Sequence, residues 1–310
     1  MIGAILTGGY GKRMQGVSSD IPKNLLPLKN GYLILDRQLR DFRIAGIGKV
    51  YMLTGYRGEM IESRYGSEWN GMEIVYLTED MPKGTLWSVR NLFQHTNEDI
   101  LLRNGDTICD VDLREVVDFY SKKMAMATMI VTRMVSPYGI VEMRGDRVKS
   151  FMEKPVLNHY INAGTYVLSR RMEHYLSLEY VERDVERTVF TRMAEEGEIA
   201  AFRYGGFWRS IDSLKDYEEV TSIYTSREDF DFGSIVRKNQ TVILDLLSGK
   251  RALVRGTGSV KVLSGKVDIA GMTVGKGEKM DVAANVAVDS ITASSVLLSG
   301  SITVETSGGT

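Results

Sequence analysis

Apolar and polar residues alternate along the first 133 positions in a way that predicts strands separated by helices. The expected strands are short apolar runs, whereas the expected helices carry apolar residues three and four positions apart. The strands are residues 1–6, 49–54, 72–77, 99–103 and 125–133, and the helices are residues 33–45, 59–65, 86–94 and 112–122. This order predicts an α/β fold with a Rossmann-like, mostly parallel mixed sheet and helices on both faces.

The pattern changes after residue 138 but continues the same domain. Residues 139–152 predict a hairpin that turns at Arg144-Gly145-Asp146. A strand at 162–169, a helix at 183–195, a strand at 199–204 and a helix at 213–224 follow. Residues 226–240 are charged and lack regular periodicity. We therefore expect a first domain at residues 1–225 and a linker after it.

Residues 241–310 predict a small all-β domain, a barrel or a sandwich, because glycines separate short apolar runs. The expected strands are residues 252–255, 260–263, 266–269, 286–291, 295–298 and 302–305. The stretch Leu253–Gly271 resembles the small β domain at the amino terminus of RNA 5′-hydroxyl kinases. From Leu246 onward, seven Lys or Arg stand against five Asp or Glu and no aromatic residue occurs, so nucleic-acid binding is not expected. Oligomerisation or an allosteric contact is the expected role, which favours a homo-oligomer.

Composition excludes several classes of protein. The 39 Lys and Arg balance 40 Asp and Glu, and a net charge of −1 provides no field for nucleic acid or an anionic membrane. Cys109 is the single cysteine, which excludes a disulfide framework and a cysteine-rich zinc site. With three scattered histidines, any metal is expected on carboxylates. The opening residues resemble a core strand rather than a signal peptide, and no apolar run approaches the roughly 18 residues of a membrane span. We expect a cytoplasmic protein.

The loop after the first strand carries the first chemical signal. Glycines within residues 8–11 let the backbone approach a polyphosphate, and Arg13 and Lys23 add positive charge. The dinucleotide motif G-x-G-x-x-G does not fit, because Met14 stands at its third glycine. The phosphate-loop motif G-x-x-x-x-G-K-[ST] does not fit either, because Leu6 and Arg13 occupy its first and last positions.

This loop instead resembles that of the sugar nucleotidyltransferases, which join a nucleoside triphosphate to a sugar 1-phosphate. The family opens with a strand, Gly-Gly-x-Gly-Thr/Ser-Arg-Met/Leu and a later Pro-Lys. The matching positions are Gly8, Gly9, Gly11, Arg13, Pro22 and Lys23. Lys12 departs from the pattern, because the family has a small hydroxyl residue there. The resemblance implies that Arg13 neutralises the leaving pyrophosphate, that Lys23 contacts the α-phosphate region, and that Leu6 and the glycines bind the nucleotide.

Two aspartates are the expected metal ligands. Asp106 follows a predicted buried strand, where a carboxylate needs a cation or hydrogen bonds to offset desolvation. Taken alone, the same pattern also fits a helix cap or a turn. The resemblance implies that Asp106 and Asp212 hold a catalytic Mg²⁺, which needs few protein ligands. Three residues separate Trp208 from Asp212, whereas the family's Trp-x-Asp stretch usually has one or two.

Further stretches resemble the family's base and sugar contacts, in the family's order, although each alone is also common in turns. Glu79, Gly84 and Thr85 match a segment that touches the nucleobase and starts a helix, and with Leu6 this segment is expected to help choose the base. Lys83 stands where the family commonly has leucine. The implied sugar contacts are Gly139, Glu153, Lys154, Asn162 and Gly164, with Glu153 for hydroxyls and Lys154 for the sugar phosphate.

These motifs imply the nucleotide-diphospho-sugar transferase fold and synthesis of an NDP-sugar and pyrophosphate from an NTP and a sugar 1-phosphate. The opening favours a mannose-1-phosphate guanylyltransferase-like enzyme. Two other activities stay open. One is a glucose-1-phosphate thymidylyl- or uridylyltransferase, and the other is a cytidylyltransferase for a polyol or choline phosphate. A non-catalytic regulatory paralogue also stays open, because Lys12 and the Trp208 spacing depart from the pattern.

Overall fold

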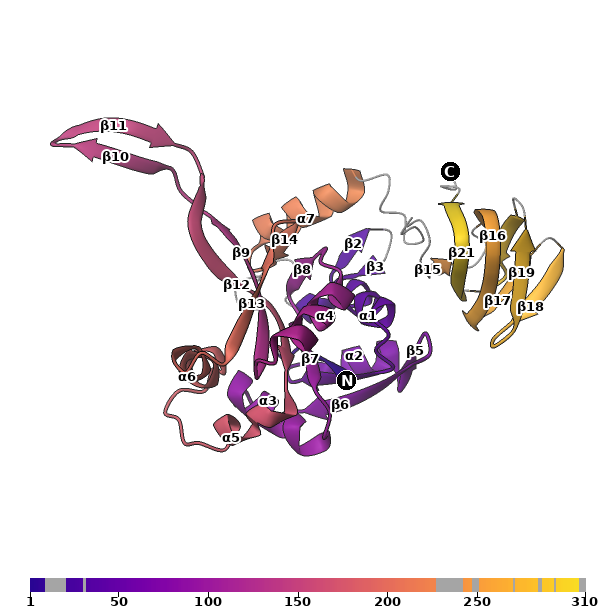
Figure 1. The fold of residues 1–310 in the computed structure, drawn as a ribbon, viewed down its shortest axis with the longest axis horizontal. Helices are drawn as coiled ribbons and strands as arrows, with labels where there is room; N and C mark the ends of the chain where they lie inside the picture. Colours follow the sequence, from indigo (N-terminus) through magenta and orange to yellow (C-terminus); the bar gives the residue numbers. More distant parts are fainter. Residues whose placement is uncertain are drawn as a thin grey trace. The chain divides into compact units, whose positions relative to one another are not determined.

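The central element is a mixed sheet, seen in a computed structural model that describes residues 1–8, 21–29, 32–226, 242–246, 251–269, 271–283, 286–292 and 294–306. Within these residues, eight strands form the sheet in the order β13-β9-β12-β7-β1-β4-β6-β5 (Figure 1). The strands are β1 (Ile2–Leu6), β4 (Lys49–Thr54), β5 (Glu68–Trp69), β6 (Met72–Thr78), β7 (Ile100–Asn104), β9 (Ala127–Val135), β12 (Val156–Leu168) and β13 (Ile199–Tyr204).

Both parallel and antiparallel pairs occur in this sheet. β1 is paired in parallel with β4 and with β7. β12 runs antiparallel to β7 and to β9, and β13 is parallel to β9. β12 begins at Val156, six residues before the expected start at residue 162. The predicted mixed α/β sheet is confirmed.

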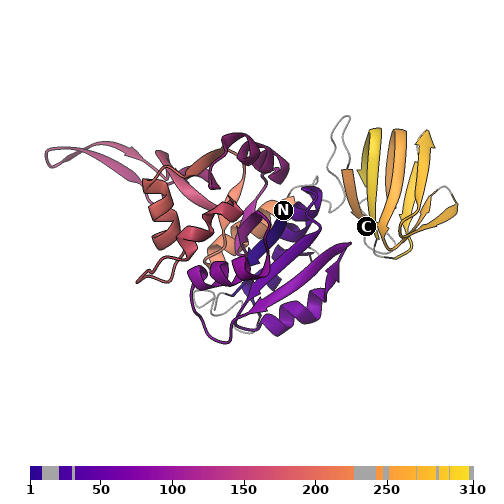
Figure 2. The same cartoon turned by 60° about the horizontal axis from the view of Figure 1, so that its bottom comes forward.

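Helices cover both faces of the sheet, as expected (Figure 2). They are α1 (Ile34–Ile44), α2 (Gly58–Tyr65), α3 (Thr85–His95), α4 (Leu113–Lys123), α5 (Glu173–Leu176), α6 (Thr191–Glu195) and α7 (Leu214–Ser226). Ile2 and Ala4 of β1 are buried in one apolar cluster with Leu86 of α3. Gly3 faces the other way, as alternation along a strand requires, and a Cβ there would lie 3.3 Å from the Phe42 ring of α1.

The helix expected at residues 183–195 is only partly present. A π-helical turn, Glu186–Phe190, continues into α6. Arg183 lies outside it, and its carbonyl oxygen accepts a hydrogen bond of 2.9 Å from the Leu86 N–H. This contact with the start of α3 explains why the helix begins later than its apolar spacing predicts.

The described part of the carboxyl-terminal region is all β, as predicted, and seven antiparallel strands form one sheet there. They are β15 (Val242–Leu246), β16 (Arg251–Ser264), β17 (Lys266–Ile269), β18 (Met272–Gly275), β19 (Lys279–Ala283), β20 (Val286–Ser290) and β21 (Ser294–Thr306). The expected strands 252–255 and 260–263 are one strand, because Gly258 pairs with Val282 rather than ending the run. Sequence patterns also missed β15, β18 and β19.

Small sheets complete the first part of the chain. They are β2 (Pro27–Lys29) with β3 (Tyr32–Leu33), β8 (Thr107–Cys109) with β14 (Trp208–Ser210), and the predicted hairpin β10 (Ile140–Arg144) with β11 (Arg147–Met152). Among the helices of the described residues, none is long and apolar enough to cross a membrane.

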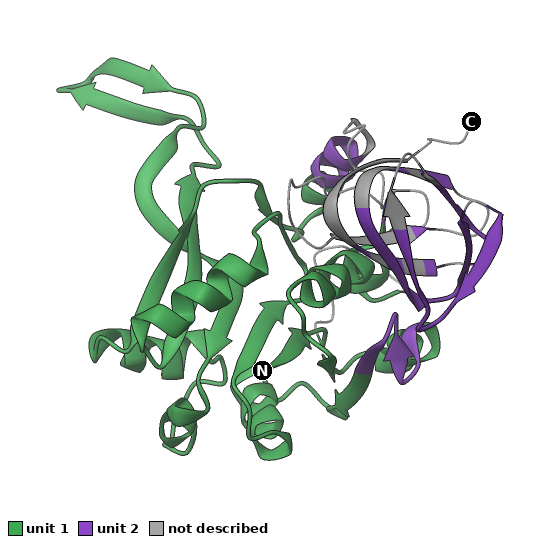
Figure 3. Ribbon diagram, turned by 45° about the vertical axis from the view of Figure 1, so that its right-hand side comes forward, with its two compact units in different colours: residues 1–27, 31–64, 74–217 green, residues 28–30, 65–73, 218–310 purple. Residues whose placement is uncertain are grey.

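The chain divides into two compact units, coloured separately in Figure 3. The first comprises the described parts of residues 1–27, 31–64 and 74–217, and the second those of residues 28–30, 65–73 and 218–310. The domain limits expected from the sequence, at residues 225 and 241, stay a prediction.

Candidate functional site

The carboxylate of Asp106 lies in a short turn between two strands. β7 ends at Asn104, and β8 begins directly after Asp106. A Cβ on Gly105 would lie 2.5 Å from the carbonyl oxygen of Leu6, to which the Gly105 N–H donates at 3.0 Å. Only glycine therefore lets this turn close against the end of β1.

The pairing of β8 with β14 brings Asp212 to the same place. The two strands run antiparallel, and the Ile211 N–H donates to the Asp106 carbonyl at 2.9 Å. Asp212 is the next residue, and the Ser210 hydroxyl donates to its Oδ2 at 2.8 Å. Two aspartates that are far apart in the sequence thus come from neighbouring strand ends.

Lys23 lies between the two carboxylates. Its Nζ is 3.7 Å from Asp106 Oδ2 and 3.6 Å from Asp212 Oδ1, and it donates to the Ile211 carbonyl at 3.1 Å. Burial raises the pKa of the Asp106 carboxyl, the Lys23 ammonium opposes this shift, and the Asp212 carboxylate adds to it. The structure brings together three of the residues that the sequence marked as catalytic.

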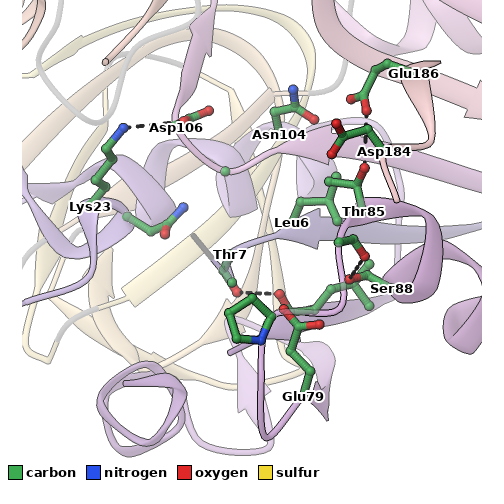
Figure 4. A pocket seen from close by; sticks show the side chains of 16 residues that line it. Leu6, Thr7, Lys23, Glu79, Thr85, Ser88, Asn104, Asp106, Asp184 and Glu186 are labelled. Carbon is green, nitrogen blue, oxygen red and sulfur yellow. Dashed lines mark hydrogen bonds and ion pairs between the residues drawn. The ribbon is translucent and has the colours of Figure 1, made fainter. Parts of the chain in front are cut away.

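Lys23 and Asp106, but not Asp212, line a cavity of about 350 Å³ at the carboxyl ends of β1 and β7. Figure 4 shows Lys23 directed at Asp106 on one side, with Thr85 and Glu186 across the pocket. The lining residues are Leu6, Thr7, Gly8, Lys23, Asn24, Leu53, Glu79, Pro82, Gly84, Thr85, Ser88, Asn104, Gly105, Asp106, Asp184 and Glu186. The expected nucleotide residues Leu6, Gly8, Glu79, Gly84 and Thr85 are among them. Gly9, Gly11, Lys12 and Arg13 lie outside the described residues.

The amino-terminal end of α3 forms part of the cavity wall. Gly84 has a φ of +90°, and a Cβ there would lie 2.5 Å from the Arg183 carbonyl oxygen. The Thr85 hydroxyl donates to Glu186 Oε2 at 3.2 Å and accepts from the Val185 N–H at 2.9 Å. The positive end of a helix dipole favours anions, so this wall suits a nucleotide.

Glu79 follows β6 and presents a fixed carboxylate to the cavity. Its Oε2 accepts a hydrogen bond of 3.1 Å from the Lys83 N–H. A Cβ on Gly8 would lie 3.2 Å from Glu79 Oε1, so the glycine lets the opening loop pass close to this group. The Lys83 ammonium lies 4.2 Å from the centre of the Trp87 ring.

Asn162 and Gly164 of β12 lie beside the cavity. Asn162 accepts from the Gly164 N–H at 2.9 Å and donates to the Tyr166 hydroxyl at 2.6 Å. Gly164 has a φ of +69°, and a Cβ there would lie 2.9 Å from Nδ2 of Asn104, a lining residue. Burial, followed by the charge and hydrogen bond of Glu186, raises the pKa of the Tyr166 hydroxyl, which stays a donor. Asn162 and Gly164, expected to contact the sugar, are therefore held close to residues that line the nucleotide cavity.

The other expected sugar residues do not line the described cavity. Gly139 precedes β10 and is half-buried, whereas Glu153 and Lys154 follow β11 and are exposed. Glu153 Oε2 would lie 3.0 Å from a Cβ on Gly139, so these two are neighbours. Lys154 has a φ of 45°, which is uncommon for a residue with a side chain. The structure does not bring this group to Asp106.

Gln38 of α1, which the sequence did not mark, holds the turn that carries Asp106. It is fully buried, and its Nε2 donates to the Asn104 carbonyl at 2.8 Å and to the Thr107 carbonyl at 2.9 Å. The available signal was a polar residue within the apolar stripe of α1, between Leu35 and Phe42. Asp184 and Glu186 were also missed, because no local pattern distinguishes them from exposed acids.

A Gln38→Met variant tests this support. Methionine keeps the side-chain volume but removes the donors, so the Asn104 and Thr107 carbonyls lose these hydrogen bonds. We expect the free energy of unfolding, measured with denaturant, to fall by about 2–4 kcal/mol. Gln94→Met on the exposed side of α3 is the matched control and leaves the free energy of unfolding unchanged. An equal result for both variants would show that Gln38 does not hold the turn.

The chain matches known proteins over its first part. A family model described as Nucleotidyl transferase matches residues 2–227. A Danio rerio protein named mannose-1-phosphate guanylyltransferase catalytic subunit beta is 32% identical over 224 residues, 69% of this chain and 61% of that protein. A mannose-1-phosphate guanyltransferase of Debaryomyces hansenii is 29% identical over 237 residues, 72% of this chain and 64% of that protein. The chain spans about three fifths of the length of these curated relatives.

Two solved structures share the fold. One is assigned as a glucose-1-phosphate thymidylyltransferase from Bacillus anthracis in complex with a sucrose; its TM-score is 0.62 at 20% identity, covering 76% of this chain and 98% of that chain. The other is a UDP-glucose pyrophosphorylase complexed with UDP-glucose; its TM-score is 0.59 at 18% identity, covering 73% of this chain and 99% of that chain. At these identities the likeness concerns the fold alone.

Proposed function

The chain belongs to the nucleotidyl transferase family, and we propose that it joins a nucleoside triphosphate to a sugar 1-phosphate with release of pyrophosphate. The observation that carries the proposal is the position of Asp106 and Asp212 around the Lys23 ammonium, beside a cavity at the strand ends. Two carboxylates that can hold a cation lie there beside an ammonium that can bind phosphate. GTP and mannose 1-phosphate are the proposed substrates, because the relatives named above are mannose-1-phosphate guanylyltransferases.

The donor set at Asp106 and Asp212 fits Mg²⁺. This ion takes oxygen ligands and keeps several waters, so two carboxylates are enough beside the substrate phosphates. A cation also offsets the desolvation that raises the pKa of Asp106. Among the described residues, no group of three or more His, Cys, Asp and Glu side chains could hold a metal. When bound, Mg²⁺ would neutralise phosphate charge and polarise the phosphorus centre.

The proposed reaction is an in-line displacement at the α-phosphorus. An oxygen of the sugar 1-phosphate forms the new bond to phosphorus, and the bond to the pyrophosphate oxygen breaks. A phosphate monoester is already an anion at neutral pH, so this step requires no general base. Such transfers depend on positioning and charge neutralisation. Lys23 would serve the α-phosphate, Arg13 the pyrophosphate and Lys154 the sugar phosphate.

Glu79 supports guanine as the base. An ionised carboxylate only accepts hydrogen bonds, and the Watson–Crick edge of guanine carries two adjacent donors, N1–H and the N2 amino group. The same edges of adenine, cytosine and uracil place an acceptor next to their donor. The Lys83 N–H, at 3.1 Å, holds the Glu79 carboxylate in the cavity wall, where a base could meet it.

On the sugar side, Asn162 and Gly164 are the proposed contacts nearest the cavity. Gly139 and Glu153 are proposed as further sugar contacts. Small residues let a pyranose ring lie against backbone, and a carboxylate accepts from sugar hydroxyls. The cytoplasmic location, the homo-oligomer and the lack of nucleic-acid binding expected from the sequence stay predictions.

A pyrophosphate-release assay tests the proposal. The full chain is incubated with Mg²⁺, each of the four NTPs and a panel of sugar 1-phosphates. We expect the fastest release with GTP and mannose 1-phosphate. Fastest release with another pair would correct the substrates but keep the reaction class, and no release with any pair would contradict the class itself.

Replacing Glu79 by glutamine should weaken the choice of base. One acceptor oxygen becomes an amino donor that faces a donor of guanine, so we expect kcat/KM for GTP to fall by about 10- to 100-fold relative to UTP. The measurement is the kcat/KM ratio for the two nucleotides. Asp80→Asn, the same change of carboxylate to amide at the exposed neighbouring residue, is the control that keeps the wild-type ratio. An unchanged ratio in Glu79→Gln would exclude Glu79 as a base contact.

A further inference from the structure

Helix α7 begins two residues after Asp212. The Tyr217 N–H donates to the Ser213 carbonyl at 3.1 Å, and the Asp216 N–H donates to the Ser213 hydroxyl at 3.3 Å. Ser213 is therefore the N-cap of the helix. The proposed metal ligand Asp212 is thus the residue just before a helix cap, where backbone N–H groups need acceptors from outside the helix.

The half-buried side chain of Asp216 reaches back across this first turn. Its Oδ2 accepts from the Ser213 N–H at 2.8 Å and from the Ser213 hydroxyl at 2.7 Å. Each of the two residues thus supplies an acceptor to the backbone N–H of the other, as in a capping box, here with aspartate three residues after the cap. The helix dipole also stabilises a carboxylate at this end of the helix.

The same carboxylate oxygen also holds Asp212. The Asp212 N–H donates to Asp216 Oδ2 at 3.3 Å, so this oxygen accepts from the backbone N–H groups on both sides of the Asp212 α-carbon. The two free backbone rotations of Asp212, φ and ψ, lie between these two N–H groups. Holding both groups on one oxygen therefore fixes the direction in which the Asp212 side chain leaves the backbone.

The helical turn that carries Asp216 is itself anchored. The Tyr217 hydroxyl donates to the Pro27 carbonyl at 2.6 Å, and burial raises the pKa of this hydroxyl, so it stays a donor at neutral pH. Pro27 lies four residues after Lys23 in the sequence. The first turn of α7 therefore contacts both the Asp212 backbone and the segment that follows Lys23.

We propose that Asp216 is a positioning residue for the cation held by Asp212, an inference that rests on the proposed function. Asp216 acts through Asp212 rather than on the cation, because its Oδ2 already accepts from three donors in the described part of the chain. A carboxylate held in one direction binds a cation at a smaller loss of conformational freedom. Groups that orient a metal ligand typically change metal affinity by about 10- to 100-fold.

Steady-state kinetics of the full chain over a Mg²⁺ series test this role. Asp216→Ala removes the acceptor, so we expect the Mg²⁺ concentration at half-saturation to rise about 10- to 100-fold. At saturating Mg²⁺, kcat returns close to the wild-type value, because Asp212 is still present. Asp216→Asn keeps an acceptor oxygen, and its half-saturation stays within about threefold of the wild type. A kcat of Asp216→Ala that stays low at saturating Mg²⁺ would contradict a role through metal binding.

Asp112→Ala is the matched control, because Asp112 caps a helix that carries none of the proposed site residues. Its carboxylate accepts from the Arg114 N–H at 3.1 Å at the start of α4. Both variants lose a helix cap and unfold at a lower temperature than the wild type, but only Asp216→Ala changes the Mg²⁺ dependence. An equal Mg²⁺ half-saturation in the two variants would overturn the proposal.

Hydrogen exchange separates this inference from the proposed function. The Asp212 and Ser213 amides exchange faster in Asp216→Ala than in the wild type, whether or not the chain turns over a substrate. Unchanged exchange at these two amides would show that Asp216 does not hold the Asp212 backbone and would overturn the proposal. No turnover of any substrate pair by the wild type, together with faster exchange in the variant, would contradict the proposed function but keep the hold of Asp216 on Asp212.

Discussion

An Asp106→Asn variant is expected to lose about 100- to 1,000-fold in kcat with GTP and mannose 1-phosphate. Asparagine keeps the size of the side chain but removes the charge that would hold Mg²⁺ beside the α-phosphate. The turn itself does not depend on this charge, because Gln38 and Ile211 bond to the backbone around residue 106. Unfolding temperature is therefore expected to stay near that of the wild type, and Mg²⁺ half-saturation to shift upward.

Asp118→Asn is the matched control for this variant. Asp118 lies exposed on α4, so the same change there leaves kcat and Mg²⁺ dependence as in the wild type. Steady-state kinetics over a Mg²⁺ series, with thermal unfolding of the same samples, give the comparison. An Asp106→Asn variant with wild-type kcat and wild-type Mg²⁺ half-saturation would remove Asp106 from the site.

The second large effect concerns the unusual spacing after Trp208. Asp212→Ser should lower kcat by about 100-fold or more, because one of two proposed metal ligands is lost. Residues 210 and 212 lie two apart, and the Ser210 hydroxyl contacts Asp212 Oδ2 at 2.8 Å, so their side chains share one side of the chain. The Trp-x-Asp spacing that this family usually has would place the carboxylate at residue 210.

The double variant Ser210→Asp/Asp212→Ser moves the carboxylate by two residues at constant net charge. We expect kcat of the double variant to be at least about tenfold higher than kcat of Asp212→Ser, because the moved carboxylate stays beside Lys23 and Asp106. Kinetics of the three proteins under saturating Mg²⁺ measure this recovery. If kcat of the double variant is no higher than that of Asp212→Ser, a carboxylate at residue 210 does not replace the one at residue 212.

The order of strands and helices in the first unit could be predicted from the sequence because its central strands are buried along almost their whole length and its helices carry one apolar side. β1, β4 and β7 are short apolar runs, and α1, α3 and α4 carry apolar stripes. The carboxyl-terminal strands were harder, because Gly258 and Gly300 pair within long strands, whereas glycine in a sequence normally predicts a turn.

The chemistry of the site could be predicted only where motifs carry it. The family resemblance indicated Lys23, Asp106 and Asp212, but the antiparallel pairing of β8 with β14 that brings them together has no sequence signal. Gln38 lies on α1 and donates hydrogen bonds to the turn that carries Asp106. Contacts between elements far apart in the sequence leave no local sequence pattern. Lys154 was expected beside the phosphate but follows β11 and is not among the residues that line the described cavity. Its role stays a prediction.

Isotope-resolved ³¹P NMR of one reaction mixture tests the central claim most directly. The full chain, Mg²⁺ and GTP are mixed with mannose 1-phosphate labelled with ¹⁸O in its free phosphate oxygens. Attack at the α-phosphorus predicts GDP-mannose that retains the label and an equal amount of unlabelled pyrophosphate. GDP with inorganic phosphate as the products, or no product while both substrates remain intact, would contradict a nucleotidyl transfer from GTP to the sugar phosphate.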